Sequence, residues 1–523
     1  MNTGAPWPDL VEAEHRVLVM QTKLHQWAMA DPGRRFDDVY NLVYDPAFLV
    51  VAWSRVRGNK RARTAGVDGV TPRSIVFGVE KLLCGLRDDL KARRFRPQRV
   101  RQKTIPKASG KVRSLGIPTV ADRVVQASLK LVLEPIFEAD FKPCSYGFRP
   151  KRRAQDAIAE IHYLGSPSRD YHWVFEADIK ACFDEIDHSA LMGRVRDRIA
   201  DKRVLGLVKA FLGAGVLTED GVHQGAITGT PQGGILSPLL ANIALSVLDE
   251  HFAHKWEALG PSWTRVKRRR AGEPVMKIVR YADDFVVMVH GTRDDAEALW
   301  DEVIAVLEPM GLRLSEEKTR VCHIDEGFDF LGWHIQRQNW QGRTGKKAVY
   351  TYPSKKALAS IVDKVRSLTR RSQHRSLAVL LRRLNPVLRG WCNYFRHGVS
   401  ARTFQLPAEL RLLANLQMAP QTTRRAEHPH PGPTPPSQLE GDRRRDRHVP
   451  TTNGRHQTLP LPGHQDPNPM GEPDPSTHRT SGMTRGEPDA VKAARPVRRA
   501  GRRNPPAERL TRRSGPTPTP ADK

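Results

Sequence analysis

The chain contains few cysteines and no cysteine pattern that would hold a structural metal ion. Its 523 residues include five cysteines, none in a Cys-x-x-Cys pair: Cys84, Cys144, Cys182, Cys322 and Cys392. This spacing predicts no zinc site. The sequence also shows no signal peptide and no apolar run long enough to cross a membrane. Scattered thiols without such signals indicate a reducing, cytoplasmic setting.

Aromatic residues are missing from the last part of the chain. Beyond Phe404 there is no Phe, Trp or Tyr, whereas 21 of the 40 prolines fall in residues 405–523. Such a segment buries too little apolar surface to offset the entropy cost of ordering it. The composition therefore predicts a disordered tail over residues 405–523.

Acidic residues are scarce relative to basic ones. The chain has 57 Asp and Glu against 85 Lys and Arg, which gives a net charge of +28 and a pI of about 10.3. The tail contributes +8 of this charge and residues 1–404 contribute +20. This balance predicts polyanion binding that weakens steeply with salt. Basic clusters such as residues 267–270 fit phosphate contacts, and each also fits a solubilising patch.

Two adjacent carboxylates lie between two short apolar runs. Residues 275–279 and 285–289 are rich in Val, Ile and Phe, and residues 281–284 between them read Tyr-Ala-Asp-Asp. Two β-prone runs joined by a short turn predict a β-hairpin with Asp283 and Asp284 at its tip. Carboxylates placed side by side repel each other, and their hard oxygens suit Mg²⁺. The alternative is a solvated Asp-Asp turn.

A second predicted strand, residues 173–178, ends in another carboxylate, Asp178, and Phe183 follows five positions later. With these two motifs the chain resembles the palm of reverse transcriptases. The resemblance implies a catalytic triad of Asp178, Asp283 and Asp284, and two Mg²⁺ ions held by these three residues and by Ile179. It also implies that Phe183 lies under the incoming sugar and excludes a 2′-hydroxyl, although an ordinary core aromatic is the alternative.

Three further segments follow the order of the same family. Residues 229–238 resemble the Gly-rich turn and helix start of motif B, where Gln232 is implied to contact the nucleotide or template. Residues 105–118 resemble the fingers hairpin, whose Lys107 and Arg113 are implied to grip the triphosphate. Residues 311–319 resemble motif D, in which Lys318 is implied to protonate the leaving pyrophosphate. An amphipathic helix is predicted between motifs C and D, over residues 293–308.

Several blocks are similar to the group II intron-encoded type of reverse transcriptase. They are residues 60–71, 122–126, 145–150 and 384–398, and the last marks the thumb, or maturase domain X. Helices are predicted over residues 355–371 and 376–384. The resemblance implies that four arginines of this region face RNA, and a solvated basic face is the alternative: Arg382, Arg383, Arg389 and Arg396.

These observations predict a mixed α/β protein with the right-hand polymerase architecture. We expect an N-terminal extension over residues 1–50 and fingers and palm over 51–345. A helical thumb, or domain X, is expected over 346–404, before the disordered basic, proline-rich tail. Relatives continue domain X with a basic, Trp-containing helix. With one choice of codons, reading residues 417–422 one base later gives such a run. We therefore hypothesise a frameshift after about Phe404, which the shifted frame of the gene tests.

The resemblance implies RNA-directed DNA synthesis coupled to maturase activity in intron splicing and retrohoming. The implied partners are intron RNA, an RNA template, a DNA target or primer and dNTPs, with no membrane and no zinc. Without Cys-x-x-Cys pairs, an HNH endonuclease module is not expected. Three alternatives remain at this stage: a binding-only maturase, a degenerate inactive copy and a reverse transcriptase repurposed by the host.

Overall fold

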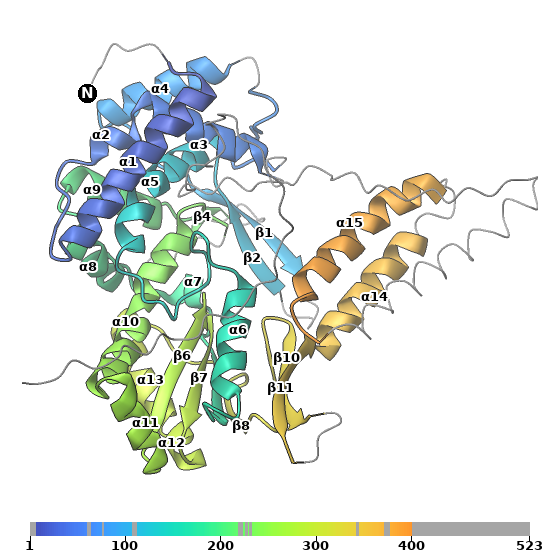
Figure 1. Cartoon of the computed structure of the whole chain (residues 1–523). Helices are drawn as coiled ribbons and strands as arrows, with labels where there is room; N and C mark the ends of the chain where they lie inside the picture. The colour runs from blue at the N-terminus through green and yellow to red at the C-terminus, as the bar shows by residue number, and fades with distance from the viewer. Residues whose placement is uncertain are drawn as a thin grey trace, which may run out of the picture. The chain divides into compact units, whose positions relative to one another are not determined.

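Figure 1 shows the computed structural model of the chain. It describes residues 7–59, 64–75, 78–106, 112–217, 223–224, 229, 233–340, 345–370 and 377–399. The predictions made for Lys107, Gln232 and the tail 405–523 lie outside these residues. Within them, no helix is long and apolar enough to pass through a membrane.

The N-terminal part is a group of helices packed around one long apolar helix, α5 (Val120–Glu138). The group consists of α1 (Leu10–Ala30), α2 (Tyr40–Val43), α3 (Pro46–Gly58) and α4 (Val79–Lys91). Asp9 and Asp45 cap the first and third of these helices by accepting backbone N–H bonds, which satisfies donors that a helix start leaves free. Gln21 of α1 donates to the carbonyl of Leu131 on α5 at 2.8 Å, and so fixes one helix on the other.

A β-hairpin follows the helices in the sequence. Strands β1 (Val100–Pro106) and β2 (Val112–Ile117) pair antiparallel, and β1 also pairs with the short β4 (Val216–Leu217), beside β5 (His223–Gln224). The hairpin predicted over residues 105–118 is therefore present, but β1 begins five residues earlier, at Val100.

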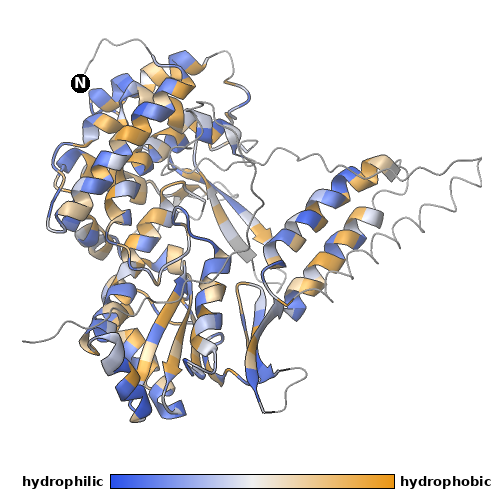
Figure 2. Ribbon diagram, viewed as in Figure 1, coloured by the Kyte–Doolittle hydropathy of each residue, from blue (hydrophilic) through white to orange (hydrophobic). Residues whose placement is uncertain are grey.

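The central sheet has the order β6-β7-β3-β8 and is antiparallel throughout. Its strands are β3 (Trp173–Asp178), β6 (Val275–Tyr281), β7 (Asp284–His290) and β8 (Arg320–His323). Successive side chains of a strand point to opposite faces. Accordingly, Phe285 and Val287 join the larger apolar core, and Val286 and Met288 join the second core on the other face. Because both faces are buried, β7 has an unbroken apolar run over residues 285–289, and orange predominates in β6 and β7 in Figure 2.

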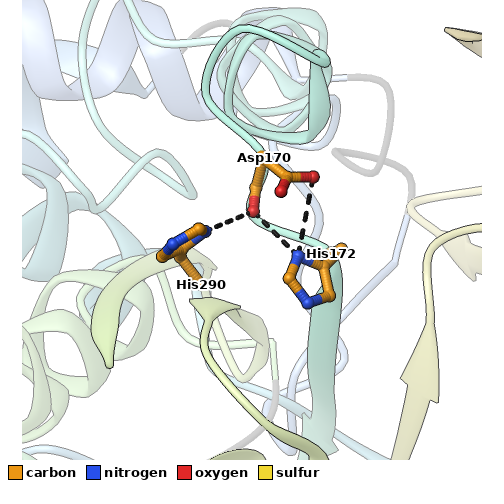
Figure 3. A group of neighbouring side chains, drawn as sticks. All are labelled: Asp170, His172 and His290. Atoms are coloured by element: carbon orange, nitrogen blue, oxygen red, sulfur yellow. Dashed lines mark hydrogen bonds and ion pairs between the residues drawn. The ribbon is translucent and has the colours of Figure 1, made fainter. Parts of the chain in front are cut away.

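One end of β3 and one end of β7 are joined through a backbone carbonyl (Figure 3). The Nδ1 atoms of His172 and His290 lie 2.9 and 2.8 Å from the carbonyl oxygen of Asp170, just before β3. The Asp170 carboxylate pairs with Arg337 at 2.7 Å. These contacts fasten the sheet at its end remote from Asp178 and Asp284.

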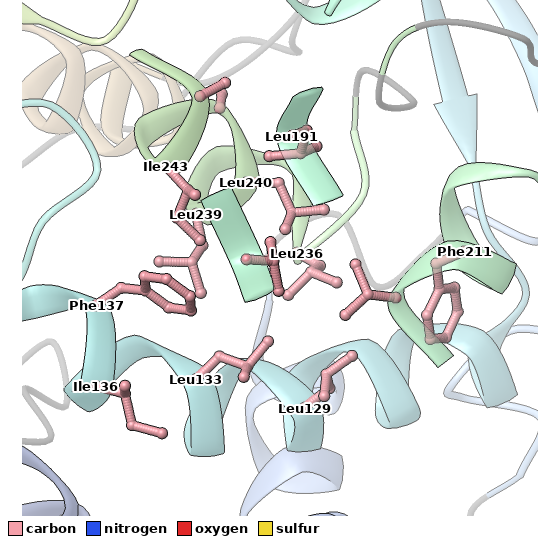
Figure 4. Packing of buried hydrophobic residues seen from close by; sticks show 14 of the residues in the cluster. Leu129, Leu133, Ile136, Phe137, Leu191, Phe211, Leu236, Leu239, Leu240 and Ile243 are labelled. Carbon is pink, nitrogen blue, oxygen red and sulfur yellow. The ribbon is translucent and has the colours of Figure 1, made fainter. Parts of the chain in front are cut away.

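Helices cover the sheet and carry its cores. They are α6 (Ala154–Gly165), α7 (Cys182–Glu185), α8 (His188–Arg198), α9 (Lys202–Leu212), α10 (Ser237–Ala258), α11 (Ser262–Arg270), α12 (Arg293–Glu297) and α13 (Leu299–Leu307), with a 3₁₀ turn at Glu308–Met310. Figure 4 shows Leu129 and Leu133 of α5 facing Leu236, Leu239 and Leu240 at the start of α10. The core thus links the N-terminal helices to the segment predicted as motif B.

Two predicted helices differ from the observed ones. The helix predicted over residues 293–308 is two helices, α12 and α13, which meet at Ala298, where the backbone stays in the α region. The helix predicted to end at Leu384 continues as α15 (Leu377–Phe395), through Pro386. Proline normally ends a helix. Here Leu384 and Leu388 on either side of it pack against α14 (Lys355–Arg370), and this packing holds the helix together.

A second small sheet connects the palm strands to these two helices. It has the order β11-β10-β9, with β9 (Phe328–Phe330), β10 (Trp333–Asn339) and β11 (Lys347–Pro353). The rings of Trp333 and Phe395 lie 4.8 Å apart, and the Val399 amide donates to the Thr351 carbonyl at 2.8 Å. The C-terminal end of α15 is therefore attached to β10 and β11. The mixed helix and strand content confirms the predicted α/β class.

Candidate active site

Three carboxylates meet at one end of the central sheet. The β6–β7 hairpin pairs Tyr281 with Asp284, so Ala282 and Asp283 form its tip. Across β3 and β7, Asp178 is the direct partner of Asp284. Directly opposed residues of antiparallel strands have Cβ atoms about 5 Å apart. The predicted hairpin is therefore present, but only Asp283 lies at its tip, because Asp284 is the first residue of β7. The register brings Asp178, 106 residues earlier in the sequence, beside Asp284.

A cavity of about 810 Å³ opens over these carboxylates. Its lining includes Asp178, Ile179, Phe183, Asp283 and Asp284. The last three residues of β2, 115–117, and the start of α10 also line the cavity. The cavity therefore brings together the four residues implied as metal ligands and the residue implied as the sugar gate.

The carboxylates influence one another electrostatically. Desolvation in the cavity, followed by repulsion from Asp283 and Asp178, raises the pKa of Asp284 to about 7. The Asp284 residue is itself exposed to solvent, so we give more weight to the two neighbouring charges than to desolvation. A cation placed among these oxygens would relieve the repulsion, and carboxylate and carbonyl oxygens are ligands that Mg²⁺ accepts. The donor set therefore suits Mg²⁺.

Lys318 supplies a positive charge at the same place. Its ammonium group pairs with Asp178 Oδ2, and this hydrogen bond is the main cause of the raised pKa of Lys318. The Lys318 side chain is 63% exposed, so the pair is accessible from the cavity. The segment predicted as motif D is thus held against the carboxylates.

Phe183 approaches the cavity from a tight turn. Ala181 before it has φ +43°, and α7 begins at Cys182. Opposite, Gly233 has φ +114°, and a Cβ there would lie 2.6 Å from the carbonyl oxygen of Gly116. The predicted need for glycine in motif B therefore applies to Gly233, because only glycine permits both this φ and this approach to the hairpin.

Some of the other residues predicted to contact the nucleotide or RNA lie among the described residues, and others do not. Arg113 lies on β2 opposite Ile105, whereas Lys107 and Gln232 are outside the described residues. Arg382, Arg383 and Arg389 are exposed on α15, and Arg396 is exposed just after it. The structure thus places the four arginines on a surface, away from the buried face of the helix.

One element of the site was not predicted from the sequence. Arg280, just before the tip of the hairpin, is fully buried and donates to the Ala282 carbonyl at 2.9 Å. It also binds Asp249 and Asn242 of α10 and the Ser145 hydroxyl. An arginine between Val279 and Tyr281 of a predicted strand was the available signal, because a buried guanidinium needs partners.

The backbone beneath the hairpin tip is tightly packed. Ala282 adopts φ +59°, and a Cβ on Gly147 would overlap its backbone nitrogen. The Gly147 carbonyl accepts from the Asn242 amide at 2.8 Å. Residues 145–150 therefore pack against the hairpin tip and support it. From the sequence, these residues were predicted only to resemble a block of the group II intron-encoded family.

Asp170, His172 and His290 each place one metal-binding atom within 4.8 Å of the other two. His290 has a backbone carbonyl facing each ring nitrogen, Asp170 at Nδ1 and Arg269 at Nε2. A carbonyl oxygen only accepts, so a nitrogen bonded to it donates and has no lone pair for a metal. Asp170 is also paired with Arg337. This group is better described as a hydrogen-bonded junction (Figure 3).

Comparison with known proteins identifies the two parts of the chain separately. The family model described as reverse transcriptase (RNA-dependent DNA polymerase) matches residues 105–335, and that of the group II intron, maturase-specific domain matches residues 358–410. The first match contains all three carboxylates, and the second contains α15.

Individual relatives agree with both matches. Protein YkfC of Escherichia coli is 36% identical over 356 residues, which cover 65% of this chain and 93% of the relative. The group II intron-encoded protein LtrA of Lactococcus lactis is 31% identical over 444 residues, covering 71% of this chain and 72% of the relative. Nuclear intron maturase 1, a mitochondrial protein of Arabidopsis thaliana, is 26% identical over 307 residues, which cover 44% of this chain and 43% of the relative. The chain belongs to the family of group II intron-encoded reverse transcriptases and maturases.

Proposed function

We propose that this reverse transcriptase extends a primer 3′-hydroxyl on an RNA template by a two-Mg²⁺ phosphoryl transfer. The observation that supports this is the meeting of Asp178, Asp283 and Asp284 over one cavity, with the pKa of Asp284 raised to about 7. The three carboxylates and the Ile179 carbonyl would hold the ions. When bound, two such ions activate the attacking hydroxyl and stabilise the leaving pyrophosphate.

The protein's own side chains then select and orient the nucleotide. Phe183 in the cavity wall would exclude a 2′-hydroxyl. Lys107 and Arg113 at the fingers hairpin would bind the triphosphate as charge-assisted donors. Gln232 would contact the nucleotide or template. Lys318, whose ammonium group pairs with Asp178, would protonate the leaving pyrophosphate.

The maturase part of the proposal concerns RNA binding rather than chemistry. Residues 346–404 would form the thumb, behind fingers and palm over residues 51–345 and an N-terminal extension over 1–50. The exposed Arg382, Arg383, Arg389 and Arg396 would contact intron RNA phosphates and stabilise its folded form. During retrohoming, the 3′-end of a DNA target in the cytoplasm would supply the primer.

Primer extension on an oligo(dT)-primed RNA template with dNTPs and Mg²⁺ tests the polymerase part. Asp283→Ala should lower the rate by about a thousandfold or more. Asp197→Ala, which changes an exposed carboxylate on α8, should leave it unchanged. A chain ending at Phe404 should extend the primer as the full chain does.

A folded wild-type chain that makes no product would contradict the proposal and favour a binding-only or degenerate maturase. Splicing of the parent intron would then separate these two outcomes, since only the first still promotes it.

A further inference from the structure

We infer that the outward face of α11 is an RNA-binding surface, separate from the polymerase cavity, that stacks an unpaired base and contacts its flanking phosphates. The surface consists of Trp263, Lys267 and Arg270. The inference rests on the proposed maturase function, because that function supplies an RNA bound outside the cavity.

The three side chains share one side of the helix. Residues at positions i, i+4 and i+7 of an α-helix lie on the same face, and Trp263, Lys267 and Arg270 have this spacing within α11. All three are exposed, and Trp263, at 71%, is the most exposed aromatic among the described residues. Trp263 belongs to none of the three apolar clusters, so folding does not account for it.

The other cations of α11 hold the helix in place. The Arg265 guanidinium lies 4.5 Å from the centre of the Trp256 ring, and Arg269 donates to the Arg169 carbonyl at 2.6 Å. Arg268 pairs with Glu273 at 2.8 Å. In the part of the chain that the structure describes, neither Lys267 nor Arg270 forms an ion pair. Arg265 and Arg269 therefore fix the orientation of α11, and Lys267 and Arg270 remain available to a ligand.

The surface lies away from the catalytic carboxylates. α11 precedes β6, whose seven residues run from Val275 to Tyr281 beside the hairpin tip. A strand rises about 3.3 Å per residue, so the start of β6 is roughly 20 Å from the tip. In Figure 1, α11 lies at the opposite end of β6 from α7. An RNA bound there would not occupy the primer–template cavity.

The chemistry of the face favours RNA over other partners. Residues 261–273 carry five basic residues and one acidic residue, Glu273, which gives a local positive field for a polyanion. A single exposed indole suits stacking on an unpaired base, and loops of RNA present such bases. A protein docking site would need a larger apolar area than one tryptophan provides.

The test measures RNA binding by the full chain while the cavity is filled. Saturating poly(rA)–oligo(dT) occupies the cavity, and fluorescence anisotropy follows a labelled hairpin RNA with an eight-cytidine loop, which pairs with neither strand of the competitor. Trp263→Ala should weaken hairpin binding about tenfold, since stacking on one base contributes that much or more. Trp263→Phe keeps a ring and should stay within about twofold of wild type.

The salt dependence of hairpin binding tests the two cations, Lys267 and Arg270. Lys267→Ala/Arg270→Ala should reduce the slope of log affinity against log salt by about 1.5, the value for two phosphate contacts. The matched control is Lys202→Ala/Lys209→Ala, which removes two exposed lysines of α9 that are also seven residues apart. Its slope should equal that of wild type. Equal melting temperatures will show that all variants are folded.

Hairpin binding that is unchanged in Trp263→Ala would overturn the inference. An equal loss of affinity of Trp263→Ala for a blunt duplex with the sequence of the stem would also overturn it, because a duplex offers no unpaired base. Primer extension on poly(rA)–oligo(dT) is measured in parallel and should stay at the wild-type rate in every variant. Failure of wild type to extend would contradict the proposed polymerase instead, and hairpin binding would still report on α11.

Discussion

The guanidinium of Arg280 binds both carboxylate oxygens of Asp249, with Nε 2.7 Å from Oδ1, and neither side chain is exposed to solvent. The same guanidinium donates to the carbonyl of Ala282, at the tip of the catalytic hairpin, and to the hydroxyl of Ser145. A buried ion pair of this kind adds little net stability, because desolvation opposes the attraction. We therefore expect its main effect to be on the position of the tip.

Arg280→Met should destabilise the fold by about 3–5 kcal/mol, because it leaves the Asp249 charge buried and unpaired. Adding Asp249→Leu should restore most of this stability, as measured by urea unfolding. The rate of primer extension at saturating dNTP should stay low in the double variant, because Ala282 has still lost its donor. If stability and kcat recover together, Arg280 has only a structural role.

Gly147→Ala should impair both folding and activity. The added methyl group would overlap the backbone nitrogen of Ala282, which cannot move without displacing Asp283. We expect a loss of about 1–3 kcal/mol, which is typical of overpacking. Gly193→Ala on α8 is the control: nothing lies within 4 Å of the added Cβ, so helix propensity should stabilise this variant by about 0.5–1 kcal/mol. Differential scanning calorimetry of both variants compares the two effects.

Mg²⁺ should raise the melting temperature of the wild-type chain, because it relieves repulsion among Asp178, Asp283 and Asp284. Asp283→Asn removes one of the repelling charges. Without Mg²⁺ this variant should be more stable than wild type by about 1 kcal/mol, which corresponds to one pKa unit. It should also lose most of the Mg²⁺-dependent increase. A variant that melts below wild type in EDTA would show that the carboxylates do not repel one another in the free protein.

Phe183→Val should increase the use of ribonucleotides. Shortening the side chain that lines the cavity would leave space for a 2′-hydroxyl. Steric discrimination of this size contributes about 1–3 kcal/mol, or roughly 10- to 200-fold in the ratio of kcat/KM for dNTP over NTP. Phe183→Tyr should retain discrimination, since the ring remains. An unchanged ratio in Phe183→Val would indicate an ordinary core aromatic.

Asp122 should make stability depend on pH. Burial raises the pKa of this carboxyl to about 6, against the opposing hydrogen bonds from Thr119 and Gln98. A raised pKa means that the folded state binds the proton more tightly than the unfolded chain. The contribution of Asp122 is therefore fully present below about pH 4 and is lost as the pH rises to 6.

The stability of wild type relative to Asp122→Asn should fall by up to about 3 kcal/mol between pH 4 and 6, at about 1.4 kcal/mol per pKa unit. Urea unfolding at intervals across this range measures it. The free energy of unfolding of Asp197→Asn, a change at an exposed position, should depend on pH in the same way as that of wild type. A constant difference between wild type and Asp122→Asn would show that Asp122 ionises normally.

The sequence was most informative where a function depends on local spacing. The hairpin, the strand ending in Asp178 and the glycine at position 233 were all predicted, because turns and strand periodicity are local properties. Arg280 was missed because its partners Asp249 and Ser145 lie 31 and 135 residues away. The extent of α15 was missed because its packing on α14 overcame the helix-breaking preference of Pro386.

The α14–α15 pair leaves the body of the protein and returns to it at nearly the same point. Ser354, just before α14, donates to the Gly332 carbonyl at 2.9 Å, and Val399, just after α15, donates to Thr351 on the adjoining strand. A segment whose entry and exit coincide can be exchanged as a cassette, because its replacement does not change the path of the flanking chain. Under the proposed function, the RNA-binding surface of these two helices can therefore be replaced without altering the path of the polymerase chain.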